Sequence, residues 1–128
     1  MSLPTKLLKE FDKSMLRSGY TDRSKALQTV MHSFVNDYDW NSGDKQSGAG
    51  AIIMLYDNDI YNQDEKSVKV QHDYKDVIGS TTHLHLEGDN CLETIMVSGQ
   101  INKIKKLAKY LSENRGIKSL KVHFVSLV

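Results

Sequence analysis

The sequence has few cysteines, few prolines and almost no net charge. Its 128 residues include one cysteine and one proline, and the formal net charge is +1. The lone cysteine, Cys91, excludes a disulfide within the chain, and near-neutrality argues against a protein that binds nucleic acid through bulk positive charge. No apolar run approaches the roughly 18 to 20 residues of a membrane span, and the N-terminus lacks the basic-then-apolar layout of a secretory signal. We therefore expect a cytoplasmic protein.

The small net charge conceals an uneven distribution. Cations outnumber anions from residue 1 to 25, acidic residues prevail from 57 to 93, and residues 103–121 are basic again. An average can hide a basic arm, so a nucleic-acid partner remains open. Hydrophobic residues make up 39% of the chain, which is enough to bury a core in one ordinary domain or two small ones.

Two short helices are predicted within the first 37 residues. Pro4 suits the first turn of one helix, and Gly19 ends it. Asp22 is a good N-cap for the second helix, whose apolar stripe runs from Ala26 to Val35. Neither helix can bury its stripe alone, so this part of the chain should dimerise. Residues 38–50 are polar and glycine-rich, which is typical of a linker.

Residues 51–128 show the pattern of a βαββαβ unit. Apolar or alternating segments predict strands at 51–56, 77–87, 91–98 and 120–125. A weakly defined helix is predicted at 62–76 and a second one at 101–114. This order is that of the ferredoxin-like fold, so the expected fold class is α+β.

Side chains that commonly bind metals gather in the predicted hairpin of residues 77–98. His83 and His85 alternate on one strand and therefore share a face. If the turn comprises residues 87–89, His85 lies opposite Cys91 and His83 opposite Glu93, with Cβ atoms roughly 4.5 to 5.5 Å apart. Alternate histidines alone are more often an exposed polar face, and a lone cysteine is more often a core residue. The correct phase of all three side chains favours a metal site.

Two imidazoles and one thiolate leave a first-row metal ion short of a ligand. His72 is a candidate for the fourth position. The alternatives are Asp73, Asp76, Glu93 and water. Tetrahedral geometry would favour zinc, and planar geometry nickel or copper(II). Glu93 also suits the role of acceptor for the N–H of a ligating imidazole.

The string Gln71-His72, His83-Leu84-His85 and Cys91-Leu92-Glu93 resembles the nickel-responsive transcriptional regulators of the NikR type. The resemblance covers nearly the whole chain. It implies an N-terminal ribbon-helix-helix domain at 1–37, and a ferredoxin-like, ACT-type domain at 51–128 that binds Ni(II). It also implies that His83, His85 and Cys91 bind nickel from one subunit, and that His72 completes a square plane from a neighbouring subunit. The residues that match the surroundings of the metal in this family are Glu93, Gln71 and Tyr56.

The same resemblance implies a homotetramer, formed as a dimer of dimers, that binds operator DNA and controls nickel-uptake genes. Such a protein is a regulator and not an enzyme. Most of the base-reading ribbon strand lies before the Ser2-Leu3-Pro4 segment in this family, so the chain as given should bind DNA weakly. The expected DNA contacts are mainly to phosphates, from Ser2, Lys6, Arg17, Arg23 and Ser24.

Two further hypotheses differ in class. One is a metal-binding or metal-sensing assembly that has lost sequence-specific DNA binding together with the ribbon strand. The other is an enzyme with Cys91 as nucleophile and His85 as base. The enzyme hypothesis is the weaker, because no glycine pattern of an oxyanion hole accompanies the pair.

Overall fold

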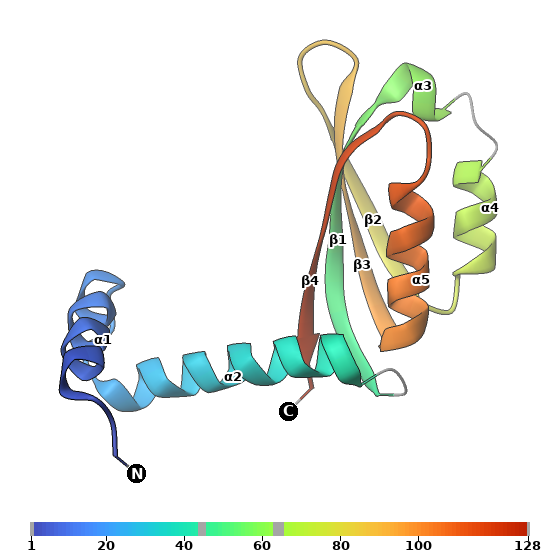
Figure 1. The fold of residues 1–128 in the computed structure, drawn as a ribbon. Coiled ribbons are helices and arrows are strands. Elements are labelled where there is room, and N and C mark those ends of the chain that lie inside the picture. Colours follow the sequence, from blue (N-terminus) through green and yellow to red (C-terminus); the bar gives the residue numbers. More distant parts are fainter. Residues whose placement is uncertain (1, 44–45, 63–65, 128) are drawn as a thin grey trace. The chain divides into compact units, whose positions relative to one another are not determined.

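The computed structural model describes residues 2–43, 46–62 and 66–127, which belong to two compact units (Figure 1). The first unit spans Met1–Val35 and the second spans Asn36–Val128. The division therefore falls two residues before the domain limit expected at residue 37. No helix in the described part of the chain is long and apolar enough to cross a membrane.

The first unit contains α1 (Thr5–Arg17) and the beginning of α2 (Arg23–Ser42). The predicted ends are confirmed: Gly19 has a positive φ of 89°, and the Lys25 N–H donates a 2.9 Å hydrogen bond to Asp22 Oδ1. Arg23 holds the two helices together by donating from Nε and Nη2 to the Asp12 carboxylate, at 2.8 and 2.6 Å.

Most of the apolar surface of the first unit is exposed. Met15 and Ala26 are buried. Seven large apolar side chains are at least 41% exposed, namely Leu3, Leu7, Leu16, Leu27, Val30, Met31 and Phe34. An apolar surface of this kind, rimmed by polar residues, commonly marks a protein interface, and this agrees with the expected dimerisation.

The second unit is a four-stranded antiparallel sheet with three helices on one face (Figure 1). The strands are β1 (Ser47–Asp57), β2 (Ile78–His85), β3 (Asn90–Gln100) and β4 (Ile117–Ser126), and the helices are α3 (Asn58–Asn62), α4 (Lys66–Asp73) and α5 (Ile101–Ser112). The spatial order of the strands is β2-β3-β1-β4. This is the expected ferredoxin-like arrangement in an α+β fold.

The core of this unit lies between the sheet and α5. Alternate residues of β1 and β3 are buried, as the two-residue period of a strand requires. The helix contributes the apolar residues that its period predicted, namely Ile101, Ile104, Leu107, Ala108 and Leu111. The opposite face of the sheet carries exposed apolar side chains, among them Ile53, Leu84 and Met96.

Much of the segment expected to be a linker, residues 38–50, is regular structure. Helix α2 continues to Ser42, and its last turns pack against the second unit's own sheet. The Trp40 and Phe124 rings have centroids 5.6 Å apart, and Asn36 Oδ1 accepts a 2.7 Å hydrogen bond from the Ser126 N–H. Tertiary packing therefore extends the helix where the local composition indicated a break.

Two glycines of this segment, Gly48 and Gly50, belong to β1. A Cβ on Gly48 would overlap the Phe124 ring, and a Cβ on Gly50 would overlap the His123 carbonyl oxygen. Glycine at these positions lets β4 approach β1 closely. Residues 44 and 45 of the expected linker lie outside the described residues.

The single helix expected at 62–76 is replaced by α3 and α4, and residues 63–65 lie outside the described part. Helix α3 starts directly after β1, where Asp57 Oδ1 accepts hydrogen bonds from the N–H groups of Asp59 and Ile60 at 3.0 and 3.2 Å. A helix of five residues is too short to show a hydrophobic period. The one sequence feature that indicates this helix is Asp57, a residue type that commonly caps the N-terminus of a helix.

Candidate metal centre

The β2–β3 hairpin has the register expected from a turn at residues 87–89. His85 pairs with Cys91, and His83 pairs with Glu93. Cys91 also pairs with Tyr56 of β1, so Tyr56, Cys91 and His85 form one row across three neighbouring strands. Paired residues point to the same face of a sheet, so one row of three side chains and the neighbouring His83–Glu93 pair all face the helices.

The two potential ligands His85 and Cys91 are in contact. Cys91 Sγ lies 3.1 Å from His85 Nδ1. Metal bonds of about 2.0 Å to nitrogen and 2.3 Å to sulfur would separate these atoms by about 3.0 Å at a right angle and about 3.5 Å at the tetrahedral angle. The observed 3.1 Å is a hydrogen-bond distance between the thiol and the imidazole, and it brings both donors within reach of one ion without selecting a coordination geometry.

His83 is held by a carboxylate. Its Nδ1 lies 3.2 Å from Glu93 Oε1; the His83 side chain is 54% exposed and that of Glu93 is 11% exposed. When Nδ1–H donates to this carboxylate, Nε2 keeps the lone pair that a metal ligand needs. Glu93 thus fits the expected role of acceptor for an imidazole N–H.

Tyr56 supplies a hydroxyl beside the thiol. Burial raises the pKa of the Tyr56 hydroxyl above its usual range, and the neighbouring Glu93 and Cys91 raise this pKa further. The phenol therefore keeps its proton at neutral pH. It is hydrogen-bonded to the Cys91 side chain, so it can donate to a thiolate there.

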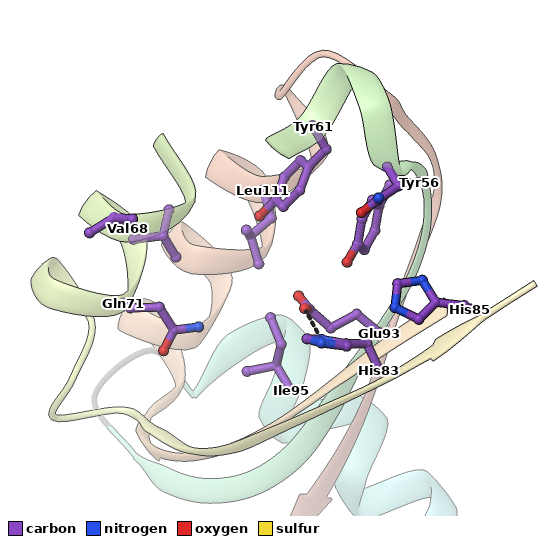
Figure 2. A pocket seen from close by; sticks show the side chains of 11 residues that line it. Tyr56, Tyr61, Val68, Gln71, His83, His85, Glu93, Ile95 and Leu111 are labelled. Atoms are coloured by element: carbon purple, nitrogen blue, oxygen red, sulfur yellow. Dashed lines mark hydrogen bonds and ion pairs between the residues drawn. The ribbon is translucent and has the colours of Figure 1, made fainter. Parts of the chain in front are cut away.

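A cavity of about 400 Å³ adjoins the hairpin (Figure 2). His83, His85 and Glu93 line it from the sheet, and Val68 and Gln71 line it from α4. Figure 2 shows the Gln71 amide directed into the cavity, toward the side where His83 and Glu93 lie. The three residues expected around the metal, Glu93, Gln71 and Tyr56, thus line one cavity.

His72 lies elsewhere. It follows Gln71 on α4 and is exposed, but it does not line this cavity. Successive helix residues diverge by about 100° around the axis, so α4 turns these two side chains in different directions. Within the described part of the single chain, no group of three His, Cys, Asp or Glu side chains is arranged to hold a metal ion.

The residues expected to contact DNA all lie in the first unit. All are exposed: Ser2 precedes α1, Lys6 lies in its first turn, Arg17 ends it, and Arg23 and Ser24 lie in the first turn of α2. Arg23 differs from the others, because its guanidinium is paired with Asp12. The Arg23 ion pair was not expected from the sequence, although the positions of Asp12 and Arg23 on two successive helices were.

An antiparallel sheet of ferredoxin-like order with a histidine–cysteine hairpin defines a metal-binding domain of the ACT type. Residues 49–125 match the family model described as the NikR C terminal nickel binding domain. The chain therefore belongs to the NikR family, which consists of regulators and not enzymes.

Relatives of similar length support this membership. A protein of Methanocaldococcus jannaschii, named as a nickel-responsive regulator, is 37% identical over 122 residues, which are 95% of this chain and 86% of the relative. One from Dictyoglomus thermophilum with the same name is 35% identical over 128 residues, 100% of this chain and 94% of the relative. One from Thermococcus kodakarensis, also so named, is 37% identical over 118 residues, 92% and 85% of the two chains.

Proposed function

We propose that this protein senses Ni(II) and regulates transcription in response, as the names of its relatives indicate for them. The observation that carries the proposal is the 3.1 Å separation of His85 Nδ1 and Cys91 Sγ, because it brings an imidazole and a thiol within reach of one metal ion. Cys91 binds as thiolate, and His83 and His85 bind as neutral imidazoles.

The fourth ligand is His72 of a neighbouring subunit. Two features of the single chain support this assignment: α4 directs Gln71 to its own cavity and His72 away from it, and the chain by itself has no three-donor site among its described residues. Each nickel site then joins two subunits, so metal binding stabilises the assembly. The exposed apolar face of the sheet offers the second unit a surface for this association.

The assembly is a homotetramer, a dimer of dimers. The first units pair through their exposed apolar stripes, and the second units associate around the nickel sites. Operator DNA is the partner of the paired first units, with Lys6, Arg17, Ser2 and Ser24 contacting phosphates. Arg23 has a different role. Its pair with Asp12 holds the start of α2 in place, and this positions the N–H groups of the first turn to bind a phosphate.

The decisive experiment is a nickel titration of the full chain, followed by gel shift on DNA from a neighbouring nickel-transporter promoter. We expect one Ni(II) per chain with a nickel–thiolate charge-transfer band, and a DNA shift that requires nickel. Nickel binding without this band would overturn the ligand assignment. Nickel binding without any DNA shift would instead support a metal-sensing assembly that does not bind operator DNA.

A further inference from the structure

Tyr61 of α3 is a buried tyrosine that lines the cavity beside the metal hairpin, together with Tyr56. Tyr61 is 6% exposed and Tyr56 is 4% exposed. Their rings pack against each other, with centroids 4.6 Å apart and an angle of 42° between the ring planes (Figure 2). Aromatic pairs at this separation attract each other, so the ring of Tyr61 restricts the movement of the Tyr56 ring.

The backbone that carries Tyr61 is anchored to two loops. The Asn58 N–H donates to the Asp89 carbonyl oxygen of the hairpin turn at 2.7 Å, and the Asp57 N–H donates to the Gly116 carbonyl oxygen at 2.8 Å. Gly116 has a φ of 90°, and a Cβ there would lie 3.1 Å from the Tyr61 nitrogen. Glycine therefore lets this loop pass close to α3. The Tyr61 ring is thus presented to Tyr56 from a fixed backbone.

The hydroxyl of Tyr56 links this ring pair to the proposed ligand Cys91. Tyr56 and Cys91 are paired across β1 and β3, and the Tyr56 hydroxyl is hydrogen-bonded to the Cys91 side chain. A phenol that donates to a thiolate withdraws electron density from the sulfur and so changes its properties as a metal ligand. Whether the hydroxyl points at the sulfur depends on the orientation of the Tyr56 ring, and Tyr61 packs against that ring.

We propose that Tyr61 is a positioning residue for the metal centre: its ring fixes the Tyr56 ring, so that the Tyr56 hydroxyl donates to the thiolate of Cys91. This inference rests on the proposed nickel function. Tyr61 acts through Tyr56 and does not itself bind the ion. A hydrogen bond to a ligating sulfur lowers the energy of its lone pair, so charge transfer from sulfur to metal requires more energy. The wavelength of the nickel–thiolate charge-transfer band therefore reports whether the hydrogen bond is made.

The test compares the wavelength of this band among nickel-saturated variants of the full chain. Tyr56→Phe removes the donor and should move the band to longer wavelength. Tyr61→Leu removes the ring that fixes the donor and should move the band in the same direction. The double variant Tyr56→Phe/Tyr61→Leu should show no shift beyond that of Tyr56→Phe, because Tyr61 acts through the Tyr56 hydroxyl. Tyr61→Phe keeps the ring and should keep the wild-type band.

Tyr110→Leu is the matched control. Tyr110 is a partly buried tyrosine of α5 that packs against the same core but does not line the metal cavity, so its loss should leave the band unchanged. Circular dichroism of each metal-free variant verifies folding. If Tyr61→Leu does not fold, Tyr61→Met takes its place, because methionine also lacks the ring and adapts to irregular gaps in a core.

Three results would overturn the proposal while leaving the nickel function intact: a wild-type band in Tyr56→Phe, a wild-type band in the variant without the Tyr61 ring, or a further shift in the double variant. A shift in Tyr61→Phe would also overturn it, because the Tyr61 hydroxyl and not the ring would then act on the site. Absence of the band from the nickel-loaded wild type is a different outcome, because it would refute the proposed nickel–thiolate site and this inference with it.

Discussion

His85 and Cys91 face each other across the β2–β3 hairpin, with Nδ1 of the histidine 3.1 Å from Sγ of the cysteine. The two side chains are brought together by backbone pairing alone, before any ion binds. Pre-organisation of this kind removes part of the entropic cost of binding. The hairpin is therefore the rigid half of the proposed site, and His72 is the half that depends on assembly.

Replacing the thiol should remove the spectroscopic signature of the site. In Cys91→Ser, we expect the nickel–thiolate charge-transfer band to disappear, since a hydroxyl is a poor ligand for nickel at neutral pH. Absorbance during a nickel titration measures this effect. Ser98→Ala, at an exposed position of the same strand, should leave the band unchanged. Retention of the full band in Cys91→Ser would contradict the assignment of Cys91.

Glu93 should tune the site without binding the ion. Glu93→Gln keeps the shape of the side chain but removes the charge that accepts from His83, so nickel affinity should fall by about 10- to 100-fold. The charge-transfer band at saturating nickel should persist, because Cys91 still binds. A competition titration against a chelator of known affinity measures the change. Loss of the band would show instead that Glu93 or its neighbourhood supplies a ligand.

The origin of the fourth ligand can be tested by mixing subunits. His72→Ala chains keep an intact hairpin, and Cys91→Ala chains keep an intact His72. If each site is shared between subunits, co-refolded mixtures of the two variants should show the charge-transfer band at low nickel concentrations, at which His72→Ala lacks it for want of affinity and Cys91→Ala lacks it for want of the thiolate. The absorbance of the mixture relative to each separate variant is the measurement. A mixture without the band would place His72 in the site of its own chain or outside it.

The Arg23–Asp12 pair should make the first unit sensitive to acid. The hydrogen bonds and charge of Arg23 hold the pKa of the Asp12 carboxyl below its usual range. A depressed pKa in the folded state contributes stability above the ordinary value, and this stability is lost as pH falls through the folded-state pKa. The Arg23 side chain is 54% exposed and that of Asp12 is 32% exposed, so solvent screens the pair and the effect should be small.

Asp12→Asn should therefore lower the melting temperature slightly at neutral pH and flatten its decline between pH 5 and about 3. Thermal unfolding followed by circular dichroism at several pH values measures this. Asp37→Asn, which removes an exposed carboxyl of α2, serves as the control and should retain the wild-type pH dependence. An unchanged pH profile in Asp12→Asn would mean that the pair makes no net contribution.

The sequence predicted the hairpin more fully than the segments around it. Alternation along β2 and a turn of known length were sufficient to pair His85 with Cys91, because a strand has a fixed two-residue period. The course of residues 38–50 depended on tertiary contacts that local composition does not encode. Gly48 and Trp40 are explained only once Phe124, more than 70 residues later, is seen beside both.

Gly48 offers a direct test of this long-range packing. A Cβ at this position would overlap the Phe124 ring, and Phe124 in turn contacts Trp40, the only tryptophan of the sequence. Gly48→Ala should therefore displace the ring, destabilise the second unit by about 1 to 3 kcal/mol and shift the Trp40 fluorescence to longer wavelength as water reaches the indole. Urea unfolding followed by this fluorescence measures both effects.

Gly79→Ala is the matched control for this substitution. A Cβ at Gly79 would meet only the Met96 carbonyl oxygen at 3.5 Å, an ordinary contact distance, so the Trp40 emission should remain that of the wild type. The comparison separates the loss of glycine as such from the loss of space for Phe124. Equal stability and equal emission in Gly48→Ala and the wild type would show that β1 and β4 do not approach as closely as the packing of Phe124 requires.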